Sequence, residues 1–200
     1  MAAYDPRTAL LVVDVQNDFA DPDGGLSVPG GATIVPKLNR EIRAAIEAGA
    51  SVIYTQDWHP SSTPHFAKDG GIWPVHCVGE TWGAAFHPEL LVAGPSVRKG
   101  VDGGDGYSGF SVRDPASGDE HATELESLLL ERGVERVVIG GLATDYCVRE
   151  TTLDAIERGF TATVLTDAVA AVDLQPGDGA AALDAMAAAG ALLAASDDGG

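Results

Sequence analysis

Short apolar runs alternate with helical patterns along most of the chain, and this alternation constrains the fold more than any other feature. The run ALLVVDVQ (9–16) is rich in β-branched residues, as in strands covered on both faces. The next segment, IVPKLNREIRAAIEAG (34–49), has apolar residues at helical spacing and stops at a glycine. Further strand-like runs are 51–57, 96–100, 135–142, 161–169 and 191–196, and further helical patterns are 122–133, 145–160 and 179–191. We therefore predict a three-layer αβα protein of the α/β class, with a mostly parallel central sheet of about six strands.

Two stretches interrupt this pattern. Residues 58–95 are irregular and broken by prolines, and DGGDGYSGFSVRDPASGDE (102–120) is a second irregular stretch. Since there is no internal repeat or linker, we expect a single domain over residues 1–200 with an irregular insert at about 58–95. In parallel sheets the ligand site lies beyond the carboxyl ends of the strands. Asp14, the loop after Asp57 and the turn at 142–147 fall at such ends.

The formal net charge of −18 argues against nucleic acid or an anionic membrane as a partner, because both repel a polyanion. An acidic chain with so few lysines fits either a GC-rich genome or a salt-adapted cytoplasm. The apolar run near the N-terminus is too short for a signal-peptide core or a membrane span, so we expect a cytoplasmic protein. In a reducing cytosol a disulfide between the two cysteines is not expected. The sequence leaves open whether the chain forms a homo-oligomer.

The stretch TQDWHPSSTPHF (55–66) concentrates metal-ligand residues on a loop. Asp57 and His59 are two positions apart at a strand end, His65 follows in the same loop, and His76 comes from the segment IWPVHC. One carboxylate and three imidazoles suit a divalent transition metal such as Zn²⁺, Fe²⁺ or Mn²⁺, with coordination positions left open. Taken singly, each histidine also fits a surface or packing role. Cys77 is a fifth candidate ligand but is more typical of a small buried residue; His87 and His121 are assigned nothing.

Cys147 is the candidate nucleophile. It lies one turn into the helix after VVIGG, with Thr144 or Asp145 as the expected N-cap. A helix N-terminus favours thiolate and offers N–H groups to an oxyanion, although packing against the sheet is the alternative role for a lone cysteine. Asp14, at the end of an apolar strand, and Lys99 could supply the carboxylate and the ammonium that acyl transfer requires.

Several motifs together resemble the nicotinamidase (pyrazinamidase) branch of the isochorismatase-like cysteine hydrolases. The motifs DVQNDF, QDWHP, WPVHC, RKG, YSGF and GLATDYCVRET occur in the family's order. The resemblance implies a catalytic triad of Asp14, Lys99 and Cys147, and a metal held by Asp57, His59 and His76 with His65 as a further ligand, a position at which members vary. It implies a cis peptide at Leu142–Ala143 and an oxyanion hole formed by the N–H groups of Ala143 and Cys147. The implied substrate-binding residues are Phe19, Trp73, Tyr107 and Leu142. One departure is the glycine-rich stretch VDGGDGYSGF, whose length varies in the family.

The activity implied by the resemblance is hydrolysis of nicotinamide to nicotinate and ammonia through a cysteine thioester, which would feed NAD salvage. The partner would be a small pyridine carboxamide, with pyrazinamide as an alternative substrate. The cofactor would be one divalent metal (Zn, Fe or Mn) that orients the pyridine ring, with no organic cofactor. The competing readings are an amidase of the same superfamily acting on an N-carbamoyl or aliphatic amide, an isochorismatase-type ether hydrolase, and a non-catalytic metal-binding or redox-sensing protein.

Overall fold

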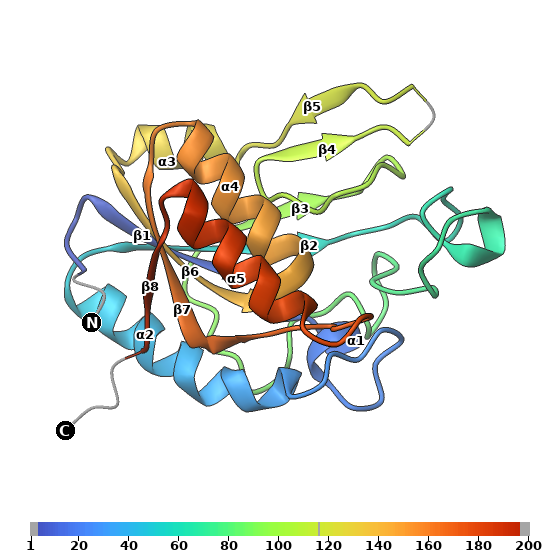
Figure 1. Ribbon diagram of the computed structural model, residues 1–200, viewed down its shortest axis with the longest axis horizontal. Coiled ribbons are helices and arrows are strands. Elements are labelled where there is room, and N and C mark those ends of the chain that lie inside the picture. The colour runs from blue at the N-terminus through green and yellow to red at the C-terminus, as the bar shows by residue number, and fades with distance from the viewer. Residues whose placement is uncertain (1–3, 116, 197–200) are drawn as a thin grey trace.

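A computed structural model describes residues 4–115 and 117–196, so the domain predicted over 1–200 extends at both ends beyond the described residues. The centre is a six-stranded sheet in the order β3-β2-β1-β6-β7-β8 (Figure 1). Every neighbouring pair of strands is parallel. The strands are β1 (Thr8–Val13), β2 (Ser51–Asp57), β3 (Ser96–Lys99), β6 (Arg136–Leu142), β7 (Thr161–Ala170) and β8 (Leu192–Ala194). This confirms the predicted parallel sheet.

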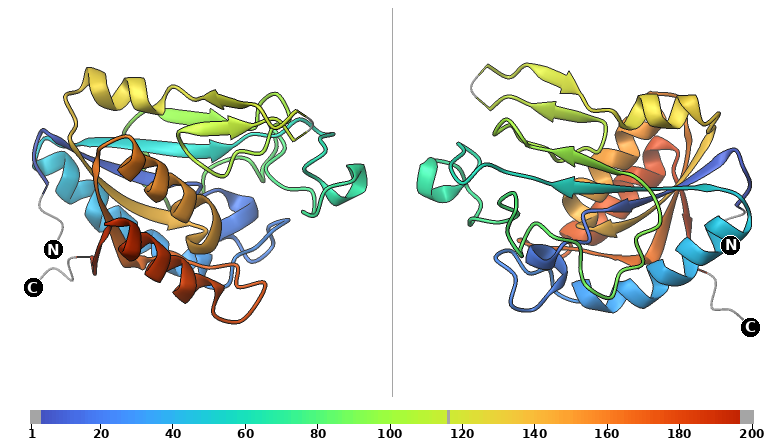
Figure 2. Two further views of the ribbon diagram at one scale, coloured as in Figure 1. Left: turned by 45° about the horizontal axis from the view of Figure 1, so that its top comes forward. Right: turned by 180° about the vertical axis from the view of Figure 1, so that it is seen from behind.

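Helices cover both faces of the sheet. Helix α2 (Val35–Glu47) packs on one face, and α3 (Leu125–Glu131), α4 (Arg149–Glu157) and α5 (Asp178–Ala189) pack on the other. The additional views separate these layers (Figure 2). The three-layer αβα architecture expected from the sequence is therefore confirmed. Among the described residues, no helix has the length and apolar character that crossing a membrane requires.

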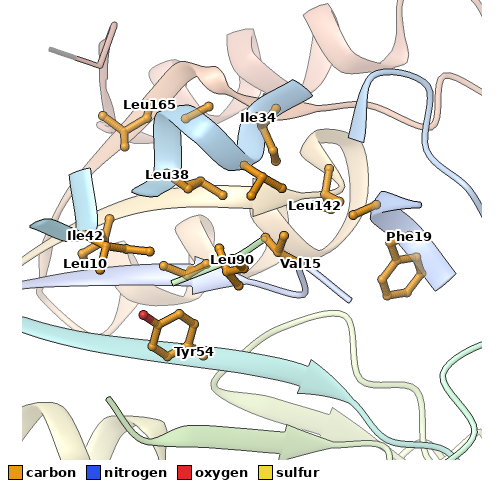
Figure 3. Packing of buried hydrophobic residues seen from close by; sticks show 14 of the residues in the cluster. Leu10, Val15, Phe19, Ile34, Leu38, Ile42, Tyr54, Leu90, Leu142 and Leu165 are labelled. Carbon is orange, nitrogen blue, oxygen red and sulfur yellow. The ribbon is translucent and has the colours of Figure 1, made fainter. Parts of the chain in front are cut away.

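The core consists of two clusters because successive strand residues point to opposite faces. On β1, Leu10 and Val12 belong to the cluster under α2, whereas Leu11 and Val13 belong to the cluster under the other three helices. All four side chains are fully buried. Figure 3 shows the α2 side, where residues such as Leu38 and Ile42 pack over the sheet. A strand buried on both faces explains why β1 reads as an unbroken apolar run.

Four neighbouring strands end at the same edge of the sheet and bring the predicted residues together there. Lys99 is the last residue of β3, Asp57 is the last of β2, Asp14 follows β1, and Ala143 follows β6. The register pairs Asp57 with Lys99 directly. The segment after β2 is irregular apart from the short 3₁₀ turn η2 (Ala67–Asp69), as predicted for this region.

The structure also contains elements that the sequence patterns did not predict. These are α1 (Asn17–Ala20), the 3₁₀ turn η1 (Gly31–Ile34), and the antiparallel pair β4 (Ser111–Arg113) and β5 (Glu120–Ala122). The helix predicted from residue 122 begins only at Leu125, because residues 120–122 pair with β4 and the Thr123 hydroxyl accepts the Leu125 N–H at 3.1 Å.

Candidate active site and metal centre

Asp14, Lys99 and Cys147 meet in a buried cluster at the carboxyl edge of the sheet. Lys99 Nζ lies 2.7 Å from Asp14 Oδ2 and 3.6 Å from Cys147 Sγ. Asp14 also accepts a hydrogen bond from the Thr55 hydroxyl at 2.6 Å. Asp14 and Lys99 are fully buried, and Cys147 is 6% exposed. The structure therefore brings together a nucleophile, a carboxylate and an ammonium out of contact with bulk water.

Burial and close pairing set the protonation of this cluster. Burial raises the pKa of Asp14 above its ordinary value, and Lys99 opposes the rise. Burial alone would lower the pKa of Lys99, but Asp14 and Asp57 raise it well above its ordinary value. Burial also raises the pKa of the Cys147 thiol well above its ordinary value; Lys99 opposes this rise, and the neighbouring carboxylates add to it. The two carboxylates thus favour the charged form of Lys99, and burial favours the neutral thiol form of Cys147.

One expectation about the turn that carries Cys147 is corrected. The turn that carries it, Thr144–Val148, is a π-helix whose N-cap is Ala143, and the Asp145 carboxylate instead accepts the N–H groups of Val172 and Asp173. Neither Thr144 nor Asp145 is therefore the cap. Burial and the adjacent carboxylates raise the pKa of the Cys147 thiol, against the lowering expected of a helix N-terminus, and Lys99 opposes that rise.

The backbone before Cys147 is tightly organised. The peptide bond Leu142–Ala143 is cis, at the position that the resemblance implied. The Ala143 carbonyl accepts the N–H groups of Tyr146 at 3.1 Å and Val148 at 3.0 Å. These bonds fix the turn that presents Cys147 to the pocket.

The residues predicted to bind a metal also converge. Ligand atoms of His59, His65 and His76 lie within 4.8 Å of one another, and all three side chains are buried. Asp57 Oδ2 lies 3.8 Å from Nε2 of His59 and 3.8 Å from Nε2 of His76. Such spacings are close to those between ligands that share one metal about 2.1 Å away.

Three features of these side chains fit a divalent metal. Both ring nitrogens of His59 are buried without a hydrogen-bond partner, and such atoms are costly unless something binds them. His76 Nδ1 lies 2.8 Å from the Pro74 carbonyl, so it carries the proton and leaves Nε2 as the lone-pair donor. Burial lowers the pKa of His76 to about 4 and also lowers the pKa of His65, so both rings are neutral, as metal ligands must be.

Asp57 joins the metal cluster to the triad. Its Oδ1 accepts a hydrogen bond from Lys99, while Oδ2 faces the histidines. Burial alone would raise the pKa of Asp57, but Lys99 and His59 hold it below its ordinary value. Two carboxylates, Asp14 and Asp57, thus share one buried ammonium, and a divalent cation would balance the remaining negative charge.

A pocket opens between the two clusters. Phe19, Trp73 and Tyr107 line it as predicted, together with Cys147 and the metal-side residues Asp57, His65 and His76. The Trp73 indole N–H donates to the Tyr107 hydroxyl at 2.8 Å, which fixes both rings. Leu142 is not brought into the pocket, because its side chain points into the core under α2 (Figure 3).

Sequence reasoning missed three lining residues, Leu26, Tyr146 and Val172. Tyr146 packs edge-on against Trp73, with ring centroids 4.9 Å apart, and its position next to Cys147 was a usable signal. Leu26 and Val172 come from distant segments and carry no such signal. Three predicted site residues, Asp14, His59 and Lys99, are buried and do not line the pocket. Cys77, the fifth candidate ligand, is a fully buried free thiol that is also outside the lining.

This chain is similar in sequence and in fold to known proteins. The family model described as "Isochorismatase domain" matches residues 8–198. A nicotinamidase of Escherichia coli (strain K12) is 38% identical over 206 residues, which cover 94% of this chain and 94% of the relative. The crystal structure of pyrazinamidase of Pyrococcus horikoshii in complex with zinc superposes with a TM-score of 0.85 at 41% identity, covering 95% of this chain and 99% of that one. PnC1 from L. infantum in complex with nicotinate gives a TM-score of 0.86 at 33% identity, covering 97% and 96%.

Proposed function

Because the chain belongs to the isochorismatase family, we propose that it is a metal-dependent amidohydrolase that converts nicotinamide to nicotinate and ammonia. The observation that carries this proposal is that Cys147 of the buried triad lines one aromatic-lined pocket together with Asp57, His65 and His76 of the histidine–carboxylate cluster. The match over residues 8–198 also supports the single domain proposed for the chain.

The chemistry on the amide belongs to the triad. Asp14 takes the proton of the Cys147 thiol, and the sulfur attacks the carboxamide carbon while Lys99 balances the negative charge nearby. We assign the N–H groups of Ala143 and Cys147 to the oxyanion that forms. Asp14 then delivers its proton to the departing ammonia, leaving a thioester. A water molecule, deprotonated by Asp14, hydrolyses the thioester to the carboxylate and frees the thiol.

We assign Asp57, His59, His65 and His76 to the metal. A metal bound by these residues would supply Lewis-acid character with which to orient the pyridine ring. Zinc is the metal we would test first, with iron and manganese next, because mixed nitrogen and oxygen ligands suit all three. Phe19, Trp73 and Tyr107 would hold the flat ring, and pyrazinamide would fit the same contacts.

The cysteine variant Cys147→Ala tests the mechanism. We expect ammonia release from nicotinamide to fall by about 10³-fold or more, the scale seen when a covalent nucleophile is removed. A variant that keeps most of its activity would overturn the cysteine mechanism.

Metal analysis distinguishes the competing readings. An N-carbamoyl or aliphatic amidase that shares only the triad would keep its activity in chelator. For the proposed enzyme we expect loss of activity in chelator and recovery on adding zinc. A non-catalytic metal-binding protein would bind zinc but release no ammonia.

A further inference from the structure

His65 is held by a carboxylate from a distant part of the chain. Its Nδ1 lies 2.6 Å from Asp105 Oδ1, although the two residues are 40 positions apart. The His65 side chain is 5% exposed and that of Asp105 is 28% exposed. No sequence pattern indicated this pair, because Asp105 belongs to the irregular glycine-rich stretch.

This contact fixes which His65 nitrogen can face a metal. A carboxylate oxygen can only accept a hydrogen bond, so Nδ1 must carry the proton and donate it. The other nitrogen, Nε2, then has its lone pair free. The ring also stacks on His59, with centroids 4.8 Å apart, and this stacking keeps His65 beside the other ligands. Carboxylate-oriented histidines of this kind recur in metal sites.

The position of Asp105 does not depend on the metal. Its backbone N–H and carbonyl exchange hydrogen bonds with Arg113 at 2.7 Å and 2.9 Å, which ties it to β4. The adjacent Gly106 carbonyl accepts a hydrogen bond from Lys99. Asp105 is therefore anchored between the hairpin and the triad, and its side chain reaches across to the metal loop.

We propose that Asp105 is a positioning residue that makes His65 a metal ligand in this protein. The inference rests on the proposed metal site and adds a residue that neither the sequence motifs nor the pocket chemistry had assigned to the metal.

Zinc affinity of the purified protein, measured by competition with a chromophoric chelator, tests the proposal without relying on activity. We expect Asp105→Ala to weaken zinc binding by about 10- to 100-fold, the range seen when the hydrogen-bond partner that orients a metal-binding histidine is removed. Asp105→Asn keeps an acceptor and should lose less. Asp102→Ala, an exposed acid on the same loop, is the matched control and should bind zinc like the unmodified protein.

A double-mutant cycle with His65→Ala shows whether Asp105 acts through His65. We expect Asp105→Ala to have no further effect on zinc affinity once His65 is absent. An equal loss in both backgrounds, or unchanged affinity in Asp105→Ala, would overturn the proposal. If the unmodified protein binds zinc and hydrolyses nicotinamide while Asp105→Ala binds zinc equally well, only the role of Asp105 fails. If the unmodified protein binds none of zinc, iron(II) and manganese(II), both this proposal and the metal dependence fail.

Discussion

Lys99 is the residue on which the buried site most depends. Its ammonium contacts Asp14, Asp57, the Gly106 carbonyl and the Cys147 sulfur, and the side chain is fully buried. Buried charges persist only when they are paired and hydrogen-bonded. Here one cation serves two carboxylates that belong to different parts of the site.

Replacing Lys99 with methionine should therefore damage both stability and activity. Two buried carboxylates would lose the ammonium that they share, and breaking a buried pair in this way costs about 3–5 kcal/mol. We expect that loss in the free energy of unfolding, measured by urea denaturation of the metal-free protein, together with loss of ammonia release. Lys37→Met is the control, because Lys37 lies at the surface 3.5 Å from Asp167, and such pairs contribute about 1 kcal/mol or less. Equal stability of the two variants would contradict the central role of Lys99.

At the residue scale, sequence motifs and positions at strand ends were enough to predict most of the candidate site residues. Asp14, Asp57 and Lys99 each stand at a strand end, and the ends of adjacent parallel strands must meet. The partners within the site could not be predicted, because a hydrogen bond such as His65–Asp105 joins two irregular segments. The protonation of Cys147 was also out of reach, since it depends on burial and on carboxylates supplied by other strands.

At the scale of elements, the hairpin and the glycine-rich segment before it were the main omissions. Strands β4 and β5 have three residues each and are partly or fully exposed, so they carry no apolar alternation to detect. Two glycines before β4, Gly100 and Gly106, lie where a side chain would collide with the site. A Cβ at Gly100 would lie 2.7 Å from the His59 ring, and one at Gly106 would lie 3.0 Å from the Lys99 side chain. The segment must therefore lack side chains where it passes the metal cluster and the triad.

Gly100→Ala should accordingly weaken metal binding. The new methyl group would push against His59, and the positive φ of 78° adds a backbone cost of about 1–2 kcal/mol. Gly133→Ala separates the two effects, because Gly133 has a φ of 65° with nothing within 4 Å of the added Cβ. We expect both variants to lose unfolding free energy but only Gly100→Ala to lose zinc affinity. Unchanged zinc affinity in Gly100→Ala would mean that the His59 ring can shift without cost.

At the scale of the whole molecule, strand–helix alternation predicted the class and the layers, and it could not predict the order of the strands. That order, β3-β2-β1-β6-β7-β8, places the three strands that lead into Asp14, Asp57 and Lys99 side by side. The net charge of −18 is likewise a property of the entire surface. Acidic residues also stand at the ends of three helices. Helices α2, α3 and α4 finish on the exposed residues Glu47, Glu131 and Glu157.

Added salt should therefore stabilise the protein. Self-repulsion of a strongly acidic surface lowers the stability of the compact state, and at 1 M salt the screening length falls to about 3 Å. An acidic residue at a helix C-terminus also opposes the helix dipole, by about 0.3–1 kcal/mol at low ionic strength. We expect the melting temperature to rise from low salt to about 1 M sodium chloride.

A triple variant, Glu47→Gln with Glu131→Gln and Glu157→Gln, tests directly whether acidic charge at the helix ends destabilises the protein in low salt. Removing three unfavourable charges should stabilise the protein in low salt by about 1–3 kcal/mol in total, which corresponds to a melting temperature higher by roughly 2–4 °C per kcal/mol. In high salt the triple variant and the unmodified protein should converge, because screening has already removed the repulsion. A melting temperature that falls with salt would show instead that surface ion pairs such as Lys68–Asp69 outweigh the net charge.

Nicotinamide hydrolysis that peaks in low salt would count against adaptation of this acidic surface to a salty cytoplasm.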